Sequence, residues 1–348
     1  MIKIKKDSLI VSLDAMGGDN APDVVIEGAS IYSKKNKNVK YIIHGDEKHI
    51  LPIINNFRNL KNKVELIHTD KFILSDEKPS NALRKGRDSS MGMTFQAVKD
   101  GKADCAVSAG NTGALMALSL FILRPMEGVK RPAICTAIPH SKGWSAVLDL
   151  GANLECSAEN LVQFGLMGSV FYNIYKQEKN PSIGLLNIGT EEMKGREEIK
   201  QASEILEKTN VVNYYGFVEG NDIGKGTTDV IVADGFTGNV TLKTIEGTAT
   251  FIANTIKTEF KKPIFGLLAG IIGYPVFRKI KKKMNPELYN GAILLGLNGV
   301  AVKSHGSASA VGFANAIGVA VELVERDFIK KLKSELTKIK FSEMKDER

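Results

Sequence analysis

The sequence contains no run of about 18 consecutive apolar residues, which is the length that a membrane-spanning helix requires. Its first ten residues are rich in lysine but lack the apolar stretch and the cleavage site of a secretory signal peptide. Neither a membrane-spanning nor a secreted protein is therefore indicated, and we expect a cytoplasmic protein.

Cysteine is scarce as well. The three thiols, Cys105, Cys135 and Cys156, show no CxxC spacing, so neither a disulfide framework nor a structural zinc site is indicated. We expect buried thiols that behave as small apolar side chains. The five histidines show no HExxH or similar ligand spacing, and we therefore predict no metal site.

Three common motifs of nucleotide and ester chemistry are also absent. The sequence has no GxxxxGK[ST] phosphate loop, no GxGxxG after the first apolar run and no GxSxG. A P-loop enzyme, a dinucleotide site and an α/β-hydrolase nucleophile are therefore not indicated.

The charge balance is basic. The chain carries 47 Lys and Arg against 39 Asp and Glu, for a net charge of +8 at pH 7. An excess of positive charge favours an anionic partner, such as nucleic acid, a membrane surface, a phosphorylated substrate or an acidic protein. Because no helix-turn-helix, zinc finger or aromatic RNA-binding pattern is present, we do not expect a nucleic-acid partner.

A strand–loop–helix rhythm organises the chain. Short runs rich in Val, Ile and Leu end in loops of Gly, Asn and Asp, and helical patterns follow. The predicted strands cover residues 9–13, 103–108, 146–150, 183–187 and 230–233. This alternation predicts an α/β fold, with a mostly parallel, Rossmann-like sheet between two helical layers, as one domain over residues 1–348. We expect the five loops to meet at one edge of the sheet, where such folds bind ligands.

These loops suit a phosphate group. The first turn of a helix offers unpaired N–H groups and a partial positive charge, and both attract phosphate oxygens. Asn, Thr and Lys side chains in the loops add donors. Asp14, Asp19 and Asp234 oppose an anion, and they either face backbone N–H groups or a dimer partner, or orient Asn and Lys. No Ser–His–Asp relay is needed if phosphate itself is the nucleophile, because it is already charged at pH 7. Such a site must position two reactants and stabilise an oxyanion.

Residues 239–286 differ from the rest of the chain. Apolar residues recur at three- or four-residue steps from Val240 to Phe260, which predicts an amphipathic helix. An apolar stretch at 264–277 follows, and then a basic cluster. We predict a protruding helical hairpin over residues 240–288 that contacts an anionic membrane or an acidic partner. The alternative is a hairpin packed in the core or in a dimer interface. The predicted contact residues are Leu267, Leu268, Ile271, Ile272, Phe277, Arg278, Lys279, Lys281, Lys282 and Lys283.

Several long motifs resemble one family. They are LDAMGGDNAP at 13–22, SAGNTGA at 108–114, LDLGAN at 148–153, NIGTEE at 187–192 followed by Lys194 and Gly195, ADGFTGN at 233–239 and KSHG at 303–306. In this order they resemble the bacterial phosphate acyltransferases, PlsX, over about residues 9–325.

The resemblance implies an activity and an architecture. PlsX-like enzymes transfer a fatty acyl chain from acyl carrier protein to inorganic phosphate, and the acyl phosphate feeds phospholipid synthesis through a glycerol-3-phosphate acyltransferase. The resemblance further implies a homodimer, peripheral membrane association, no cofactor, and a sheet like that of the phosphotransacetylases and the isocitrate and isopropylmalate dehydrogenases. Two alternatives stay open, a short-chain phosphate acyltransferase that uses coenzyme A and a non-catalytic scaffold for acyl carrier protein.

The resemblance also suggests site residues. Lys194 and Asn239 correspond to the family's catalytic pair, with Lys194 stabilising the thioester oxyanion or holding phosphate and Asn239 orienting the carbonyl. Asn239 is also a candidate helix N-cap. His305 is either a phosphate donor or a structural histidine. The predicted substrate- and phosphate-binding residues are Asp14, Gly17, Gly18, Asn20, Gly110, Asn111, Thr112, Gly113, Asn153, Gly189, Thr190, Gly235, Thr237, Gly238, Lys303 and His305.

Overall fold

A single eleven-stranded sheet runs through the part of the chain that the computed structural model describes, which is residues 8–209, 212–260, 272–276, 278 and 286–338. The strand order is β3-β2-β1-β4-β11-β10-β5-β6-β9-β7-β8. The strands are β1 (Leu9–Asp14), β2 (Val39–Gly45), β3 (Val64–His68), β4 (Cys105–Ser108), β5 (Ala133–His140), β6 (Gly143–Leu148), β7 (Ser182–Leu186), β8 (Asn213–Val218), β9 (Val230–Val232), β10 (Ala292–Leu295) and β11 (Val300–Lys303).

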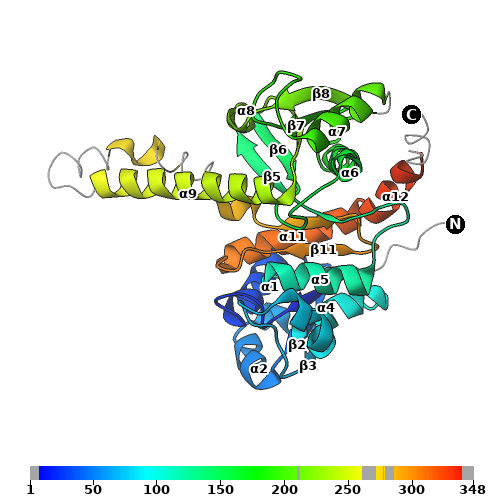
Figure 1. Ribbon diagram of the computed structural model, residues 1–348. Helices are drawn as coiled ribbons and strands as arrows, with labels where there is room; N and C mark the ends of the chain where they lie inside the picture. Colours follow the sequence, from blue (N-terminus) through cyan, green and yellow to red (C-terminus); the bar gives the residue numbers. More distant parts are fainter. Residues whose placement is uncertain (1–7, 210–211, 261–271, 277, 279–285, 339–348) are drawn as a thin grey trace.

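Helices cover both faces of this sheet (Figure 1). One face carries α1 (Asp23–Lys35), α2 (Glu47–Asn55), α6 (Ala158–Lys176), α7 (Glu197–Lys208), α11 (Ala310–Glu325) and α12 (Phe328–Lys338). The other carries α3 (Pro79–Lys85), α4 (Ser90–Lys99), α5 (Thr112–Leu123), α8 (Gly220–Lys225) and the first part of α9 (Gly235–Glu259). Short 3-10 turns lie at η1 (Arg58–Leu60), η2 (Gly86–Asp88) and η3 (Pro286–Tyr289). The predicted three-layer α/β fold is confirmed.

The central strands show why the apolar runs are continuous. In β9, Val230 and Val232 pack into the cluster on one face of the sheet, and Ile231 packs into a cluster on the other. Successive side chains of a strand point to opposite faces, so a strand covered on both sides must be apolar at every position.

The strands run in two directions. β10 is antiparallel to both β11 and β5, and β6 is antiparallel to β5. The strands β6, β9, β7 and β8 therefore run opposite to β3, β2, β1, β4 and β11. The carboxyl ends of the two sets lie at opposite edges of the sheet, so the expectation of one common edge is wrong. The physical reason is three successive antiparallel pairings, β11–β10, β10–β5 and β5–β6, which apolar runs alone do not reveal.

The final helical pattern is interrupted. The sequence predicts one helix over about 309–337, but α11 ends at Glu325 and α12 begins at Phe328. Asp327 between them has a φ of 53°, a left-handed conformation that no helix interior accepts. The break turns Phe328, Leu332 and Leu336 into the main core.

Helix α9 projects from the body of the molecule (Figure 1). It has 25 residues, which corresponds to a length of about 37 Å. Its buried residues are Gly235 and Gly238, at its beginning, and further along Phe251 is 70% exposed. Of the predicted hairpin contacts, Ile272 and Arg278 are described and exposed. Leu267, Leu268, Ile271, Phe277, Lys279, Lys281, Lys282 and Lys283 lie outside the described residues. No helix in the described part of the chain is long and apolar enough to cross a membrane.

Candidate active site

The loops after β1, β4 and β11 form the first group of predicted site residues, which we call the β1–β4–β11 loops. The N–H of Asp19 donates to the carbonyl of Gly306 at 2.9 Å, and the N–H of Ser304 donates to the carbonyl of Ser108 at 2.8 Å. A side chain at Gly17 would lie 2.8 Å from the backbone nitrogen of Gly110, so the first two loops touch. Residues about 290 positions apart are thus brought together.

Asp14 is the buried anchor of these loops. Its carboxylate accepts hydrogen bonds from the Ser108 hydroxyl at 2.7 Å and from the N–H of Met16 at 3.2 Å. Burial raises the pKa of Asp14, against these hydrogen bonds, which lower it. The carboxylate therefore faces hydroxyl and backbone donors and holds the loops together.

Asn111 caps α5. Its side-chain oxygen accepts from the N–H of Ala114 at 2.9 Å, and its amide donates to the carbonyls of Ser75 and Glu77 at 2.6 and 3.2 Å. The side chain is thus engaged in structure, whereas Thr112 in the next position is exposed at the helix N-terminus. The anion-attracting feature here is the first turn of α5 itself.

Lys303 supplies the positive charge of the first group. Its ammonium donates to the carbonyl of Ser304 at 2.6 Å. Burial lowers the pKa of Lys303 to about 8, while the carboxylates of Asp19 and Asp14 oppose this shift. A lysine held at such a pKa beside loops of this kind is a candidate functional group.

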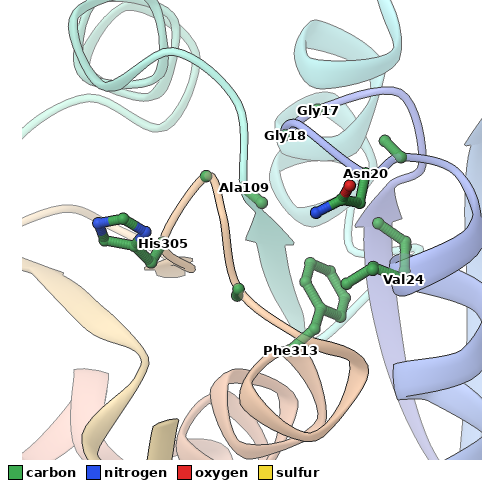
Figure 2. A pocket seen from close by; sticks show the side chains of 11 residues that line it. Gly17, Gly18, Asn20, Val24, Ala109, His305 and Phe313 are labelled. Carbon is green, nitrogen blue, oxygen red and sulfur yellow. The ribbon is translucent and has the colours of Figure 1, made fainter. Parts of the chain in front are cut away.

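A small hollow lies among the β1–β4–β11 loops, lined by Gly17, Gly18, Asn20, His305 and Phe313 among others (Figure 2). Its volume of about 10 Å³ has room for about one water molecule. In Figure 2 the imidazole of His305 points away from Asn20 and Phe313. Nδ1 of His305 lies 2.9 Å from the Ser307 hydroxyl, which leaves the ring at the surface.

The charge of Lys303 predicts a pH dependence. Lys303 is protonated below about pH 8, and with a pKa of about 8 its charged fraction falls from about 90% at pH 7 to about 10% at pH 9. If it holds phosphate, the KM for phosphate should rise over this range in steady-state assays. In Lys303→Arg the charge persists, so the same KM should change little. An unchanged KM in the original protein at pH 9 would rule out a charged Lys303 as a phosphate ligand.

The loops after β6, β7 and β9 form the second group, which we call the β6–β7–β9 loops. Their centre is the buried carboxylate of Asp149, which accepts from the backbone N–H groups of Ile134, Ala152 and Asn153 at 2.9, 3.1 and 2.7 Å. The Asn153 amide also donates to Asp149, at 2.9 Å, and to the carbonyl of Pro132, at 2.8 Å. The Asn153 carbonyl accepts from Gly235 at 2.7 Å, which joins the start of α9 to the loop after β6.

Lys194 stands on the loop after β7. Its ammonium pairs with Glu191 at 2.7 Å and the side chain is 48% exposed, while its stem lies against Gly189. The hydrogen bond and the negative charge of Glu191 raise the pKa of Lys194, so it stays a cation. The Asn187 amide donates to the Lys194 carbonyl at 3.0 Å and thereby stabilises the loop. The predicted ligand Thr190 is exposed on the same loop.

Asn239 lies in the second turn of α9, so the prediction that it is the N-cap is wrong. The N-cap is Asp234, whose carboxylate accepts from the Thr237 N–H at 2.8 Å and from the Thr237 hydroxyl at 2.8 Å. Asn239 faces Gly151, where an added Cβ would lie 3.5 Å from the Asn239 side chain. Asn239 therefore lies at the junction of the loop after β6 and the first turns of α9.

Arg196 was missed by the sequence analysis, which stopped at Gly195. Its guanidinium is ion-paired with the nearly buried Asp234 and donates to the Thr237 hydroxyl at 3.1 Å. It thereby ties the Lys194 loop to the N-terminus of α9. The signal for Arg196 in the sequence is its position two residues after Lys194. Nothing in the sequence indicates that Asp234 is its partner.

We expect Arg196→Gln to lower turnover about 10-fold while the fold stays intact, because the Lys194 loop loses its tie to α9. The measurement is kcat together with thermal unfolding. Arg196→Lys keeps one charge and should recover part of the turnover. Full activity in Arg196→Gln would contradict a role in positioning Lys194.

Helix α5 connects the two groups. Met116 lies one turn into α5. It packs against an apolar cluster that contains Leu150 and is bordered by Ala152 and Leu242. The helix that starts in the β1–β4–β11 loops thus contacts the cluster beneath the β6–β7–β9 loops. In the described part of the chain no cluster of His, Cys, Asp and Glu is arranged to hold a metal ion.

Known proteins share both the sequence and the fold. A family model described as fatty acid synthesis protein matches residues 9–331. The chain is 49% identical over 330 residues to the phosphate acyltransferase of Rhodospirillum centenum, covering 94% of this chain and 93% of that protein. It is 45% identical over 334 residues to the phosphate acyltransferase of Rhodospirillum rubrum, covering 96% of each.

Among solved structures, a phosphotransacetylase from Streptococcus pyogenes superimposes with a TM-score of 0.60 at 16% identity, covering 92% of this chain and 94% of that one. The EutD phosphotransacetylase from Staphylococcus aureus superimposes with a TM-score of 0.58 at 14% identity, covering 91% and 94%. At these identities the likeness concerns the fold, and it confirms the phosphotransacetylase-like sheet expected from the sequence.

Proposed function

Because this chain belongs to the fatty acid synthesis protein family, with relatives that are phosphate acyltransferases, we propose that it transfers a long-chain acyl group from acyl carrier protein to inorganic phosphate. The product is an acyl phosphate. The protein is an acyltransferase, and the identity of the donor and the roles of the residues are the parts proposed here.

The observation that carries the proposal is the position of Lys194. It is an exposed cation on a loop that Arg196 joins to the start of α9, where Asn239 lies. A lysine and an asparagine amide presented by neighbouring loops match the need of a thioester carbonyl, which gains negative charge on attack.

The reaction proceeds by addition and elimination. A phosphate oxygen attacks the thioester carbonyl carbon, and the carbonyl oxygen becomes an oxyanion that Lys194 stabilises while Asn239 orients the group. Collapse of this intermediate breaks the carbon–sulfur bond, and the thiolate of the carrier leaves and takes a proton from solvent. The chemistry requires positioning and charge stabilisation more than a catalytic base.

We assign phosphate to the β1–β4–β11 loops, because Lys303 and the first turn of α5 provide a cation and free N–H groups there. The link through Met116 supports this division, since α5 and the β6–β7–β9 loops border one apolar cluster. Gly110, Gly113 and Thr112 then lie near the phosphate, and Gly189, Thr190 and Asn153 shape the acyl side.

Helix α9 and residues 240–288 are assigned to the acyl chain and an anionic membrane surface. Phe251 at 70% and Ile272 at 80% exposure support this assignment. We further propose a homodimer that associates with the membrane from the cytoplasm and passes acyl phosphate to a glycerol-3-phosphate acyltransferase.

The test is an assay of palmitoyl acyl carrier protein with inorganic phosphate that follows the release of free carrier protein. Phosphate-dependent release supports the proposal. Release without phosphate would indicate a thioesterase. Activity with acetyl-coenzyme A in place of the long-chain carrier would indicate a short-chain enzyme, and no release from any thioester, with carrier binding retained, would indicate a scaffold.

A further inference from the structure

Large apolar side chains are exposed on one flank of the molecule, beside the β1–β4–β11 loops. They come from the segment after β3, from α3 and from the last turns of α5. Their exposed fractions lie between 39% and 55%. The residues are Phe72, Leu74, Leu83, Leu120 and Phe121. We call this flank, together with the basic residues Arg84, Lys85 and Arg87, the α3–α5 surface.

The α3–α5 surface is one continuous patch. Pro79, at the start of α3, abuts Gly113, at the start of α5. Gly86 packs between Ile73 and Leu118. The guanidinium of Arg87 lies 4.4 Å from the centre of the Phe121 ring. The helix α3 and the turn η2 therefore lie along α5 for most of its length.

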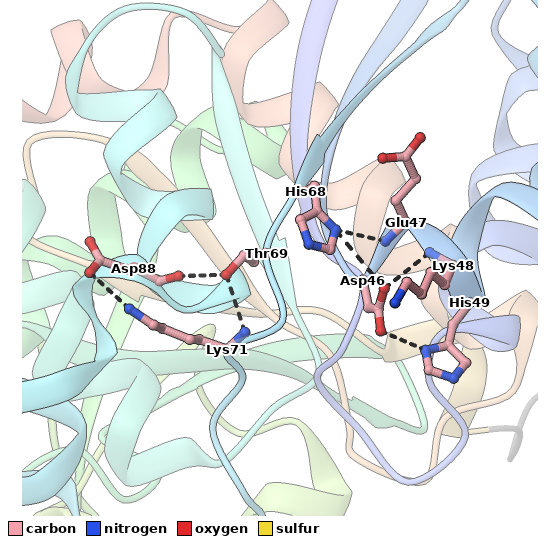
Figure 3. A network of polar contacts seen from close by, with 8 residues as sticks. All are labelled: Asp46, Glu47, Lys48, His49, His68, Thr69, Lys71 and Asp88. Carbon is pink, nitrogen blue, oxygen red and sulfur yellow. Dashed lines mark hydrogen bonds and ion pairs between the residues drawn. The ribbon is translucent and has the colours of Figure 1, made fainter.

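Hydrogen bonds fix this patch to the body (Figure 3). The Thr69 hydroxyl donates to the carbonyl of Asp88 at 2.8 Å and accepts from the N–H of Lys71 at 3.2 Å. The N–H of Ser90 donates to the Lys71 carbonyl at 2.9 Å. These hydrogen bonds hold the segment that carries Phe72 and Leu74 against η2. Its exposed apolar side chains therefore have fixed positions on the surface.

The patch is positively charged. Residues 78–87 contain four basic side chains and no acidic one, and Arg84, Lys85 and Arg87 are exposed at the end nearest Phe121. Asp76, Glu77 and Asp88 flank this stretch, so residues 71–88 together carry five basic and three acidic side chains. Exposed apolar residues beside an excess of positive charge mark an interaction surface for a partner of the opposite charge. A symmetric dimer through this patch would set the same cations against each other, which disfavours a second copy as the occupant.

The patch extends from the β1–β4–β11 loops to the opposite edge of the sheet. At one end the side-chain amide of Asn111 donates hydrogen bonds to the carbonyls of Ser75 and Glu77. At the other, the carbonyl of Arg124 accepts from the N–H of Asn298, at the amino end of β11. That is the edge of the sheet from which the β6–β7–β9 loops leave. A partner on this flank therefore lies beside the β1–β4–β11 loops and reaches the edge of the sheet from which the β6–β7–β9 loops leave.

We propose that the acidic carrier protein of the acyl-transfer reaction docks on the α3–α5 surface, with its negative helix face against Arg84, Lys85 and Arg87 and an apolar contact on Phe121. Docking there would let the flexible thioester arm pass along α5 into the site. This inference rests on the proposed function, and it leaves the basic residues at 278–283 free for the membrane.

The test is the triple variant R84E/K85E/R87E, assayed with palmitoyl acyl carrier protein at saturating phosphate. We expect the KM for the acyl carrier to rise at least about 10-fold, equivalent to about 1.4 kcal/mol, with kcat changed less than about twofold. The dissociation constant of the unacylated carrier protein, measured by fluorescence anisotropy, should rise by a similar factor. Phe121→Ser adds a variant without charge change, for which we expect a smaller rise of the same KM.

The matched control is K330E/K331E/K333E on α12, which changes the net charge equally at exposed positions elsewhere. Its KM should match that of the original protein. Palmitoyl-pantetheine, a donor without a carrier protein, should be used equally well by all variants.

An unchanged KM in R84E/K85E/R87E, an equal loss in the control or an equal loss with palmitoyl-pantetheine would each overturn the proposal. If the original protein releases no carrier at all, the proposed function fails instead.

Discussion

Replacing Lys194 with alanine should lower phosphate-dependent release of carrier protein by at least about 100-fold, which corresponds to about 2.7 kcal/mol of lost transition-state stabilisation. The reason is electrostatic. The oxyanion exists only during the reaction, so a cation placed for it raises kcat and contributes little to substrate binding. The measurement is kcat and KM with palmitoyl acyl carrier protein, and the loss should appear in kcat. Asn239→Ala should show a loss of the same kind.

Lys225 offers a matched control. It is an exposed lysine that pairs with Asp222 three residues earlier at 3.0 Å, as Lys194 pairs with Glu191. Lys225→Ala removes the same charge and the same type of ion pair away from the loops, and we expect nearly full activity. A similar loss in both variants would show that the effect of Lys194 is one of net charge or stability.

Replacing Gly238 with alanine should have the largest effect on stability. An added Cβ would overlap the backbone carbonyl oxygen of Asp149, which belongs to the hydrogen-bonded centre of the β6–β7–β9 loops. A backbone carbonyl cannot move aside as a flexible side chain can. We expect a loss of at least about 2–3 kcal/mol, seen as a lower midpoint in chemical denaturation, and a strong loss of turnover because Asn239 is the next residue.

Gly247 in the same helix is the control. Space around it is open, with no atom within 4 Å of an added Cβ. Gly247→Ala should therefore stabilise α9 by roughly 0.5–1 kcal/mol, the usual gain from replacing a helical glycine. If Gly238→Ala were as well tolerated as Gly247→Ala, the close packing of α9 on Asp149 would be disproved.

Local pattern was sufficient to predict five of the eleven strands, namely β1, β4, β6, β7 and β9. The predicted strand at 230–233 is β9 (Val230–Val232), and the predicted strand at 183–187 is β7 (Ser182–Leu186). Both depend on neighbours in sequence, namely apolar runs and turn residues. The long motifs likewise located the loops that carry Lys194 and Asn239.

What the sequence could not show depends on distant pairing. The direction of β6 relative to β1 is decided by the three antiparallel pairings among β11, β10, β5 and β6, which no local pattern encodes. The role of Arg196 depends on Asp234, and that of Asp14 on Ser108. Side chains that stabilise loops look the same in sequence as side chains that bind ligands, so the sequence could not show that Asn111 is the N-cap of α5.

The strand order also determines when each part of the site can form during synthesis. The β6–β9–β7–β8 half is built from one continuous stretch, from Gly143 to Val232, and can pack as soon as that stretch is complete. The other half needs β11 beside β4 and α11 against α1, and those partners come much later in the chain. Until then β4 is paired on one side only, with β1, and is an edge strand open to association with other chains. The Lys194 loop can therefore form before the β1–β4–β11 loops are complete, and β4 keeps its open edge until Val300 pairs with Cys105.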